Sequence, residues 1–346
     1  MTEFTTEALI RLNSLWMLFF IMISAGLAKE YNLFAPAFAY VRNTFRANKF
    51  VVVILSAIGG VLPIEGRVTV SAGLLDTVAP KCPHGRAKLG IVDYLATHHY
   101  YLWSPIEKTV ILPIAAFGIT YVEWLKLISP LLGVTFLYIT WYIWYRIKDE
   151  EIAITPTNFK LSTVMRNVFP MFIAIGAYIY HPELMVHIFG FLTLYYMFIT
   201  QQWDLKKLIG YVNWQVIIVV AVVILAATYA KMHSDELLGS LKNNLDPKNI
   251  VLLTLAGFGI TFLLGSSSKG VGLAILLAQF FGTEYFLWFF AVEFAAYILS
   301  PTHKCVAIGN RYFGTPLSTY YSALGVWALL LVLTAGVVTF ATGYLQ

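Results

Sequence analysis

The sequence predicts an all-α polytopic membrane protein, and two observations lead to that fold class. Of the 346 residues 59% are hydrophobic and only 12% are charged, an apolar share that a soluble domain of this length would not hide. Apolar runs also recur along the chain, several of them close to the roughly 20 residues that a helix needs to cross a bilayer. We therefore expect about 10 to 12 membrane segments, with the lipid bilayer as their surroundings.

The expected membrane segments follow one another along the whole chain. Examples are Leu12–Ala28, Leu127–Tyr145, Leu161–His181, Leu184–Trp203, Tyr211–Ala230 and Tyr320–Tyr344, and the apolar runs Phe50–Ile58 and Val251–Leu263 precede glycine-rich breaks. Tryptophans stand near several segment ends, as interfacial side chains do. The N-terminus, "MTEFTTEALIRLNSLW", is acidic and lacks a small-residue cleavage pattern, so we expect no signal peptide.

Basic residues gather in connections between segments and predict the orientation. Four such connections, 29–49, 81–88, 146–166 and 206–207, are assigned to the cytoplasm by the positive-inside rule. Both termini are then expected outside. No extramembrane domain carries a basic patch, so we expect no nucleic-acid partner.

One stretch of sequence occurs twice and predicts an internal repeat. "YLWSPIEKTV" (101–110) returns as "YILSPTHKCV" (297–306), with Tyr, Ser, Pro, Lys and Val at identical spacing. Each copy follows a glycine-rich break, "GGVLPIEGR" (59–67) or "LGSSSKGVG" (264–272). We therefore expect two inverted repeats, 1–150 and 208–346, joined by two spans within 151–207.

Each Ser-Pro pair predicts a broken helix inside the membrane. Proline lacks a backbone donor and disfavours helix in the preceding residue. Serine is also a good N-cap, and proline suits the first helical position. Ser104-Pro105 and Ser300-Pro301 should each end one half-helix and begin another, aiming two positive helix ends inward. A pair of proline kinks with no ligand is the alternative.

Charged and hydroxyl side chains at these breaks predict an anion site. Intramembrane charges are costly and are functional candidates by default, although lysines there also snorkel and serines also bond their own backbone. The expected substrate-binding residues are Arg67, Gly66, Ser71, Ser104, Lys269, Ser267, Ser268, Ser300 and His303.

Titratable side chains near the breaks are candidates for ion coupling. The expected coupling residues are Glu65, Glu107, His303 and Asp93, and Glu293 is a further carboxylate near a predicted span. Glu107 alternatively completes a capping box with Ser104, and His303 alternatively bonds a backbone carbonyl.

We expect no metal site and no cofactor other than a coupling ion, H⁺ or Na⁺. The adjacent His98 and His99 diverge by about 100° on a helix, and no third ligand stands at regular spacing. Two cysteines, Cys82 and Cys305, are too few for a disulfide framework.

Three stretches resemble a poorly characterised family of prokaryotic integral membrane proteins of permease type. They are "SPTHKCVAIGNRYF" (300–313), "GGVLPIEGRVTVSAGLLD" (59–76) and "DYLATHHYYLWSP" (93–105). That family is similar to the ion transporter superfamily, which includes carboxylate and gluconate-type permeases. The resemblance implies a secondary transporter in a prokaryotic-type inner membrane. Carried over by position, it places at or beside the site Pro63, Gly66, Ser71, Asp93, His98, Ser300, Pro301, His303 and Cys305.

These observations together predict a secondary active transporter rather than an enzyme. We expect a small organic anion as substrate and alternating access, with a homodimer as the candidate assembly. The chain has no G-x-x-x-x-G-K-[ST] motif, so ATP is not expected to drive it directly. The alternatives are a membrane-embedded enzyme that uses His98, His99 and His303 as acid/base groups on a lipid-like substrate, and a channel.

Overall fold

Every regular element that the structure describes is helical. The computed structural model describes residues 2–37, 40, 44, 54, 83–147, 160–232 and 247–341. Its α-helices are α1 (Thr2–Glu30), α5 (Pro83–His98), α6 (Tyr100–Trp103), α7 (Lys108–Phe117), α8 (Tyr121–Arg146), α9 (Leu161–Tyr180), α10 (Met185–Thr200), α11 (Leu205–Gly210), α12 (Trp214–Met232), α14 (Pro247–Leu264), α15 (Ser267–Phe281), α16 (Phe286–Leu299), α17 (Lys304–Phe313) and α18 (Leu317–Gly336). The all-α class is thus confirmed for this part of the chain.

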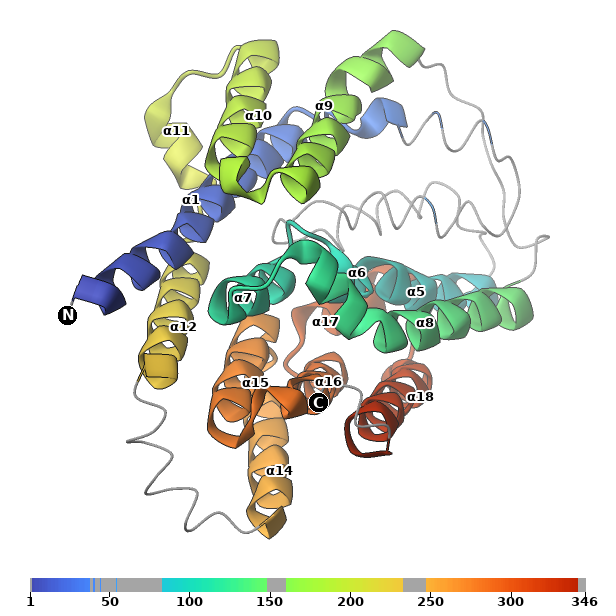
Figure 1. Ribbon diagram of the computed structural model, residues 1–346. Helices are drawn as coiled ribbons and strands as arrows, with labels where there is room; N and C mark the ends of the chain where they lie inside the picture. The colour runs from blue at the N-terminus through green and yellow to red at the C-terminus, as the bar shows by residue number, and fades with distance from the viewer. Residues whose placement is uncertain are drawn as a thin grey trace.

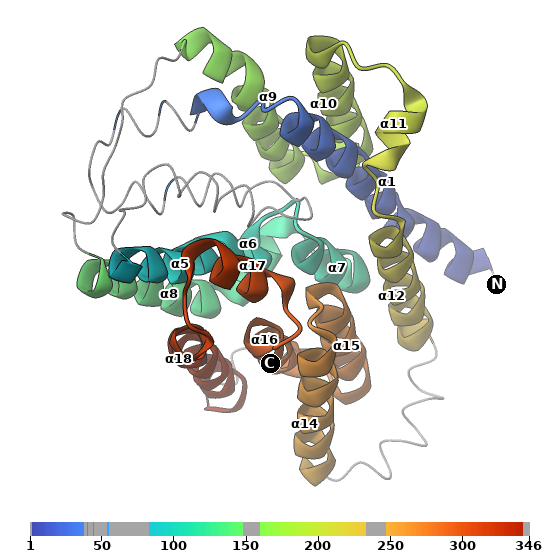
Figure 2. The same cartoon turned by 180° about the vertical axis from the view of Figure 1, so that it is seen from behind.

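The helices gather into two groups joined by α12 (Figure 1). One group holds α1, α9, α10 and α11, and the other holds α5 to α8 with α14 to α18. Helix α12 packs against α1 on one side and against α7 and α15 on the other. The view from behind shows the same division (Figure 2). Within the first group, Ser24 of α1 and Thr193 of α10 share a hydrogen bond of 2.9 Å.

Helix α16 lies at the centre of the second group. All of its residues except Trp288 and Leu299 are buried, and it packs against α14, α15 and α18. Helices α18 and α8 are tied together by two buried bonds. The Trp327 indole donates to Thr135 Oγ1 at 3.0 Å, and the Tyr138 hydroxyl donates to the Ala323 carbonyl at 2.7 Å. Because buried polar groups need partners, these bonds fix how the two helices cross.

Several helices have the length and apolar character of membrane spans. In the described part of the chain, four stretches qualify: Tyr121–Arg146, Leu161–Tyr180, Pro182–Thr200 and Leu317–Phe340. Large apolar side chains on their outer faces are exposed, for example Leu137 at 72% and Phe191 at 70%. Such extensive apolar exteriors are compatible with an integral membrane protein, since a soluble monomer rarely exposes large apolar patches.

Residues at the described ends of three basic connections contact one another in the first helix group. Glu30, at the end of α1, forms an ion pair with Lys207 of α11 and accepts a 2.5 Å hydrogen bond from the Tyr211 hydroxyl. Next to it, the Asn167 amide of α9 donates to the Leu33 carbonyl at 3.1 Å. The described ends of connections that the charge rule assigned to the same side thus lie close to one another. Which side of the membrane they occupy stays a prediction.

The Glu30 cluster also changes the acidity of its members. The hydrogen bond from Lys207, followed by that from Tyr211, lowers the pKa of Glu30, because both stabilise its ionised form. The same bond raises the pKa of Lys207. Glu30 is the last residue of α1, and the side chains of Glu30 and Lys207 are partly exposed.

Candidate functional site

The two Ser-Pro stretches have the same local structure. Helix α6 ends at Trp103 and α16 at Leu299, and the serine that follows is extended in both, with ψ of 121° at Ser104 and 129° at Ser300. The next helices, α7 and α17, are both ten residues long. Each ends at a glycine in the left-handed region, Gly118 and Gly314. The predicted helix breaks are therefore confirmed.

The predicted start of the second helix at each break was wrong. Neither serine is an N-cap, because α7 begins at Lys108 and α17 at Lys304, each three residues after the proline. Glu107 and His303 occupy the N-cap positions without a side-chain cap bond, so the capping box expected at Ser104 does not form. The box occurs instead at Thr120 on α8.

Side chains from neighbouring helices satisfy the carbonyls at the first break. The Tyr101 carbonyl accepts from Thr109 Oγ1 at 2.6 Å, and the Leu102 carbonyl from the Trp124 indole at 2.9 Å. The Trp103 carbonyl accepts from the Tyr121 hydroxyl at 2.6 Å. Carbonyls at a helix end lack intrahelical partners, and in lipid they could not be left bare. Three donors therefore make a stable interruption possible here.

The second break meets the interruption between α14 and α15. Ser300 Oγ donates to the Phe262 carbonyl at 2.5 Å, and Thr302 Oγ1 donates to the Leu263 carbonyl at 3.1 Å. Both carbonyls belong to the last turn of α14, which ends beside Gly265 with φ +57°. The side chain of Ser300 thus serves the backbone of another helix. The predicted break in "LGSSSKGVG" is confirmed.

A buried cluster of aromatic and imidazole side chains lies between the two Ser-Pro breaks. His98 Nε2 is 3.3 Å from His303 Nε2, and Tyr94 Oη is 2.8 Å from His303 Nδ1. The Tyr297 hydroxyl donates to that of Tyr101 at 3.0 Å. The exposed fraction of each of these five residues is 6% or less. These five side chains come from α5, α6, α16 and the link before α17. Together they form one polar cluster inside an otherwise apolar body.

Ring packing fixes the orientation of the two cluster histidines. The His98 ring stacks on Tyr94 with centroids 3.7 Å apart, and the His303 ring lies 4.2 Å from that of Tyr297. His98 Nδ1 is 2.8 Å from the Tyr94 carbonyl, which can only accept, so this nitrogen carries the proton. The neighbouring His99 turns away, and its Nδ1 accepts from the Trp103 indole at 2.9 Å. The predicted divergence of the two histidines is confirmed.

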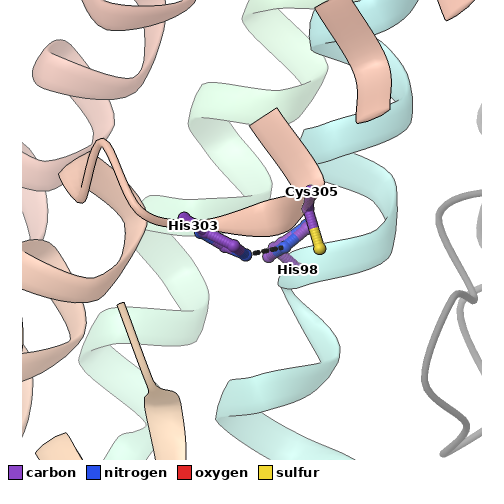
Figure 3. A group of neighbouring side chains, drawn as sticks. All are labelled: His98, His303 and Cys305. Carbon is purple, nitrogen blue, oxygen red and sulfur yellow. Dashed lines mark hydrogen bonds between the residues drawn. The ribbon is translucent and has the colours of Figure 1, made fainter. Parts of the chain in front are cut away.

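Cys305 joins this cluster from the first turn of α17 (Figure 3). One ligand atom from each of His98, His303 and Cys305 lies within 4.8 Å of the other two. The sequence offered no third metal ligand by spacing, and tertiary contact between α5 and α17 supplies it. Spacing along one helix could not reveal residues that stand more than 200 positions apart.

Three carboxylates are buried, each on a different segment. Asp93 on α5 is 1% exposed and Glu107 before α7 is 5% exposed. Glu293 on α16, 1% exposed, points toward α14 and α15. A Cβ added to Gly257 would overlap its carboxylate, and neither of its oxygens has a hydrogen-bond partner.

The remaining predicted substrate residues divide into buried and exposed ones. Ser267 and Ser268 are buried at the start of α15, while Lys269 in the same turn is exposed. Glu65, Gly66, Arg67 and Ser71 lie outside the described residues. The buried cluster that the structure describes therefore contains no lysine or arginine side chain.

Sequence reasoning did not single out Tyr94 or the pair Tyr101 and Tyr297. A signal for the pair was present, because Tyr is one of the five residues that match between the two copies of the repeated stretch. For Tyr94 there was no such signal, since its role depends on His303, which is 209 positions away.

Comparison with known proteins gives one result. A family profile described as "Protein of unknown function (DUF401)" matches residues 8–345. No curated protein matches the sequence. The profile covers nearly all of the chain and carries no assigned activity, in agreement with the predicted membership of a poorly characterised family. The chain therefore belongs to this family of proteins of unknown function.

Proposed function

We propose that the protein is a secondary active transporter that moves a small organic anion by alternating access. One observation carries the proposal: two helices of the membrane body are interrupted at Ser104 and Ser300, and both interruptions border the same buried polar cluster. Irregular backbone at membrane depth is tolerated only inside protein or beside a wet cavity. Secondary transporters build their substrate sites from such discontinuous helices.

The matched geometry of the breaks supports an origin from two repeats. Helices α7 and α17 have equal length, and their N-caps stand at matching positions of the repeated stretch. Both helices also end at a glycine in the left-handed region. In the proposal the units 1–150 and 208–346 are inverted repeats that move against each other. A relation to the ion transporter superfamily belongs to the same proposal and rests on the sequence resemblance.

An anionic substrate is favoured by the direction of the helix starts. Helices α7 and α17 both begin beside the cluster, and a helix N-terminus offers unpaired amide protons and a partial positive charge. We assign to Arg67 the positive charge that balances the anion. Lys269 has a secondary role, because its side chain is exposed.

Proton coupling is favoured by the surroundings of Glu293. Among the described residues, Gly257 and Leu273 lie near its carboxylate, and the Thr261 hydroxyl is within reach of it. An ionised carboxylate without charge compensation is very costly in such surroundings, so we assign it the neutral form. Sodium prefers several oxygen ligands, and among the described side chains the Thr261 hydroxyl is the one placed beside this carboxylate. We therefore propose H⁺ as the coupling ion.

Ligand binding followed by exchange in liposomes tests the proposal. Purified protein is first screened by thermal shift against small carboxylates, phosphonates and sulfonates, because a ligand that binds only the folded state raises the melting temperature. The best ligand is then offered in radiolabelled form to proteoliposomes loaded with the unlabelled compound. We expect saturable counterflow of the unchanged ligand. Binding without any counterflow would contradict the proposal.

A membrane-embedded enzyme is the second candidate, and the His98–His303–Cys305 cluster favours it. Imidazole and thiol groups that lie within 4.8 Å of one another can serve acid/base and nucleophilic chemistry as well as binding. The same liposome experiment separates the candidates, since an enzyme would convert the ligand chemically. Recovery of intact ligand inside the vesicles supports transport.

A further inference from the structure

Three side chains in the buried cluster have the identities and positions of metal ligands. They come from the end of α5 and from the region where α17 begins, two segments that pack directly against each other (Figure 3). His98 and His303 are almost fully buried, and Cys305 is half-buried. Two imidazoles and a thiol form a ligand set that suits zinc and related transition metals.

The spacing of the two imidazoles fits a tetrahedral ion. Zinc–nitrogen bonds of about 2.0–2.1 Å at tetrahedral angles place two nitrogens roughly 3.3 Å apart. The two Nε2 atoms of His98 and His303 are 3.3 Å apart. For nitrogen and sulfur the expected separation is roughly 3.6 Å. The ligand atoms of all three residues lie within 4.8 Å of one another, so the proposed site requires Cys305 Sγ to move closer to the two nitrogens.

The outer nitrogens of both rings already have partners of the kind that metal-bound histidines use. His98 Nδ1 donates to the Tyr94 carbonyl, and His303 Nδ1 lies against the Tyr94 hydroxyl. Metal-bound histidines usually donate their second ring nitrogen to a carbonyl or another oxygen, which fixes the tautomer and the ring plane. With Nδ1 protonated, Nε2 presents its lone pair to the ion.

Tyr94 provides two hydrogen-bond arrangements for His303. Its hydroxyl lies 2.8 Å from His303 Nδ1 and 3.3 Å from the Ile298 carbonyl. If the hydroxyl donates to Nδ1, the proton of His303 sits on Nε2 and bonds to His98. If it donates to Ile298 instead, it accepts from Nδ1–H and both Nε2 lone pairs face the same point. The second arrangement is the one that binds a metal.

We propose that His98, His303 and Cys305 bind a single divalent transition-metal ion of the zinc type. Cys305 binds as the thiolate and releases its proton to solvent. Three protein ligands leave the fourth tetrahedral position for water or for an oxygen of a bound molecule, as in zinc sites that act on substrates. The site does not depend on the transport proposal, because its test measures metal binding alone.

Cobalt substitution of the full chain tests the site. The protein is purified in detergent with a tag other than polyhistidine, stripped with a chelator and titrated with Co²⁺. We expect one equivalent to bind, with visible bands typical of tetrahedral cobalt and a near-ultraviolet thiolate-to-cobalt band. Addition of Zn²⁺ should displace the cobalt and abolish both spectra.

Matched variants assign the spectra to these residues. Cys305→Ser should remove the thiolate band, whereas Cys82→Ser should keep it. His98→Gln should weaken binding at least 100-fold, since loss of even an outer partner costs about 10- to 100-fold. The adjacent His99→Gln should leave affinity unchanged, because His99 faces Trp103. Tyr94→Phe should weaken binding by about 10- to 100-fold while keeping the tetrahedral bands.

The outcomes that would overturn the site are equally specific. Wild-type protein that binds no cobalt, or binds it without the thiolate band, contradicts the proposal. So does a Cys305→Ser variant with an unchanged near-ultraviolet spectrum. Because Cys305→Ser changes one atom at a half-buried position, a native circular dichroism spectrum of that variant excludes misfolding as the cause of any loss.

Discussion

The hydroxyls of Tyr101 and Tyr297 are hydrogen-bonded at 3.0 Å, although the two residues stand 196 positions apart. They are the same residue in the two copies of the repeated stretch, each three positions before its Ser-Pro pair. The two breaks therefore meet through equivalent side chains. This contact makes the two halves of the chain depend on each other at the polar cluster.

Removal of either hydroxyl should weaken the fold by breaking this bond. We expect Tyr101→Phe and Tyr297→Phe each to lower the free energy of unfolding by about 0.5–1.5 kcal/mol, the usual net value of a buried hydrogen bond. The double variant should cost little more than one single variant, because the bond can be lost only once. Unfolding in detergent measures all three. Strictly additive losses would show that the two hydroxyls do not interact.

The Trp124 indole should be needed for the helix break at Ser104. Trp124→Phe leaves the Leu102 carbonyl without its donor, and an unsatisfied buried polar group costs about 1–3 kcal/mol of unfolding free energy. Trp141→Phe is the control, since Trp141 is an exposed tryptophan on the same helix. Its effect should stay within about 0.5 kcal/mol. Equal effects of the two variants would rule out a role in capping.

Gly265 should not tolerate alanine, because of both its backbone and its neighbours. Its φ of +57° disfavours any side chain, and an added Cβ would overlap Thr302 Oγ1. We expect Gly265→Ala to cost at least about 1–2 kcal/mol of unfolding free energy. Gly259→Ala, within α14, meets no atom within 4 Å and should be neutral or stabilising, since alanine is the better helix former. A stable Gly265→Ala protein would contradict the described junction of α14 and α15.

The Glu30 cluster should make stability depend on pH in the acid range. Its hydrogen bonds lower the pKa of Glu30 below its ordinary 4.5, so the ionised form is favoured by folding. The stabilisation is then complete above pH 4.5 and is lost as the pH falls through the lowered pKa. We expect the melting temperature of wild type to exceed that of Glu30→Gln at pH 7. The difference between the two should disappear below about pH 4.

A control at the neighbouring lysine separates the ion pair from net charge. Lys206→Gln removes a positive charge next to Lys207 and leaves the ion pair between Lys207 and Glu30 in place. The difference in melting temperature between this variant and wild type should therefore not change as Glu30 titrates. If the Glu30→Gln gap is the same at pH 3 and pH 7, ionisation of Glu30 does not stabilise the fold.

Glu293→Gln should separate exchange from proton-driven accumulation. Glutamine imitates the neutral carboxylic acid, so the variant should fold and should still exchange substrate across proteoliposomes. It should lose accumulation driven by a pH gradient, because it cannot release a proton. The control Glu284→Gln changes an exposed carboxylate near the start of α16 and should accumulate normally. Gradient-driven accumulation by Glu293→Gln would move the coupling site elsewhere.

The sequence alone determined those features that depend on neighbouring residues. Apolar runs predicted the long helices, such as the run 161–181 that became α9, because a helix satisfies its own backbone in lipid. Proline fixed the interruptions after Ser104 and Ser300, since it disfavours helix in the residue before it. Because His98 and His99 are adjacent on the chain, helix geometry also predicted that their side chains point in different directions.

Tertiary structure decided everything that depends on contacts between distant segments. The next helix starts at Lys108 rather than at Pro105, and the break is satisfied by Trp124 on another helix. His98 meets His303 across 205 positions because α5 packs against α17. Local propensity does not encode such packing, since the hydrogen bonds and burial that stabilise it form only when the segments meet.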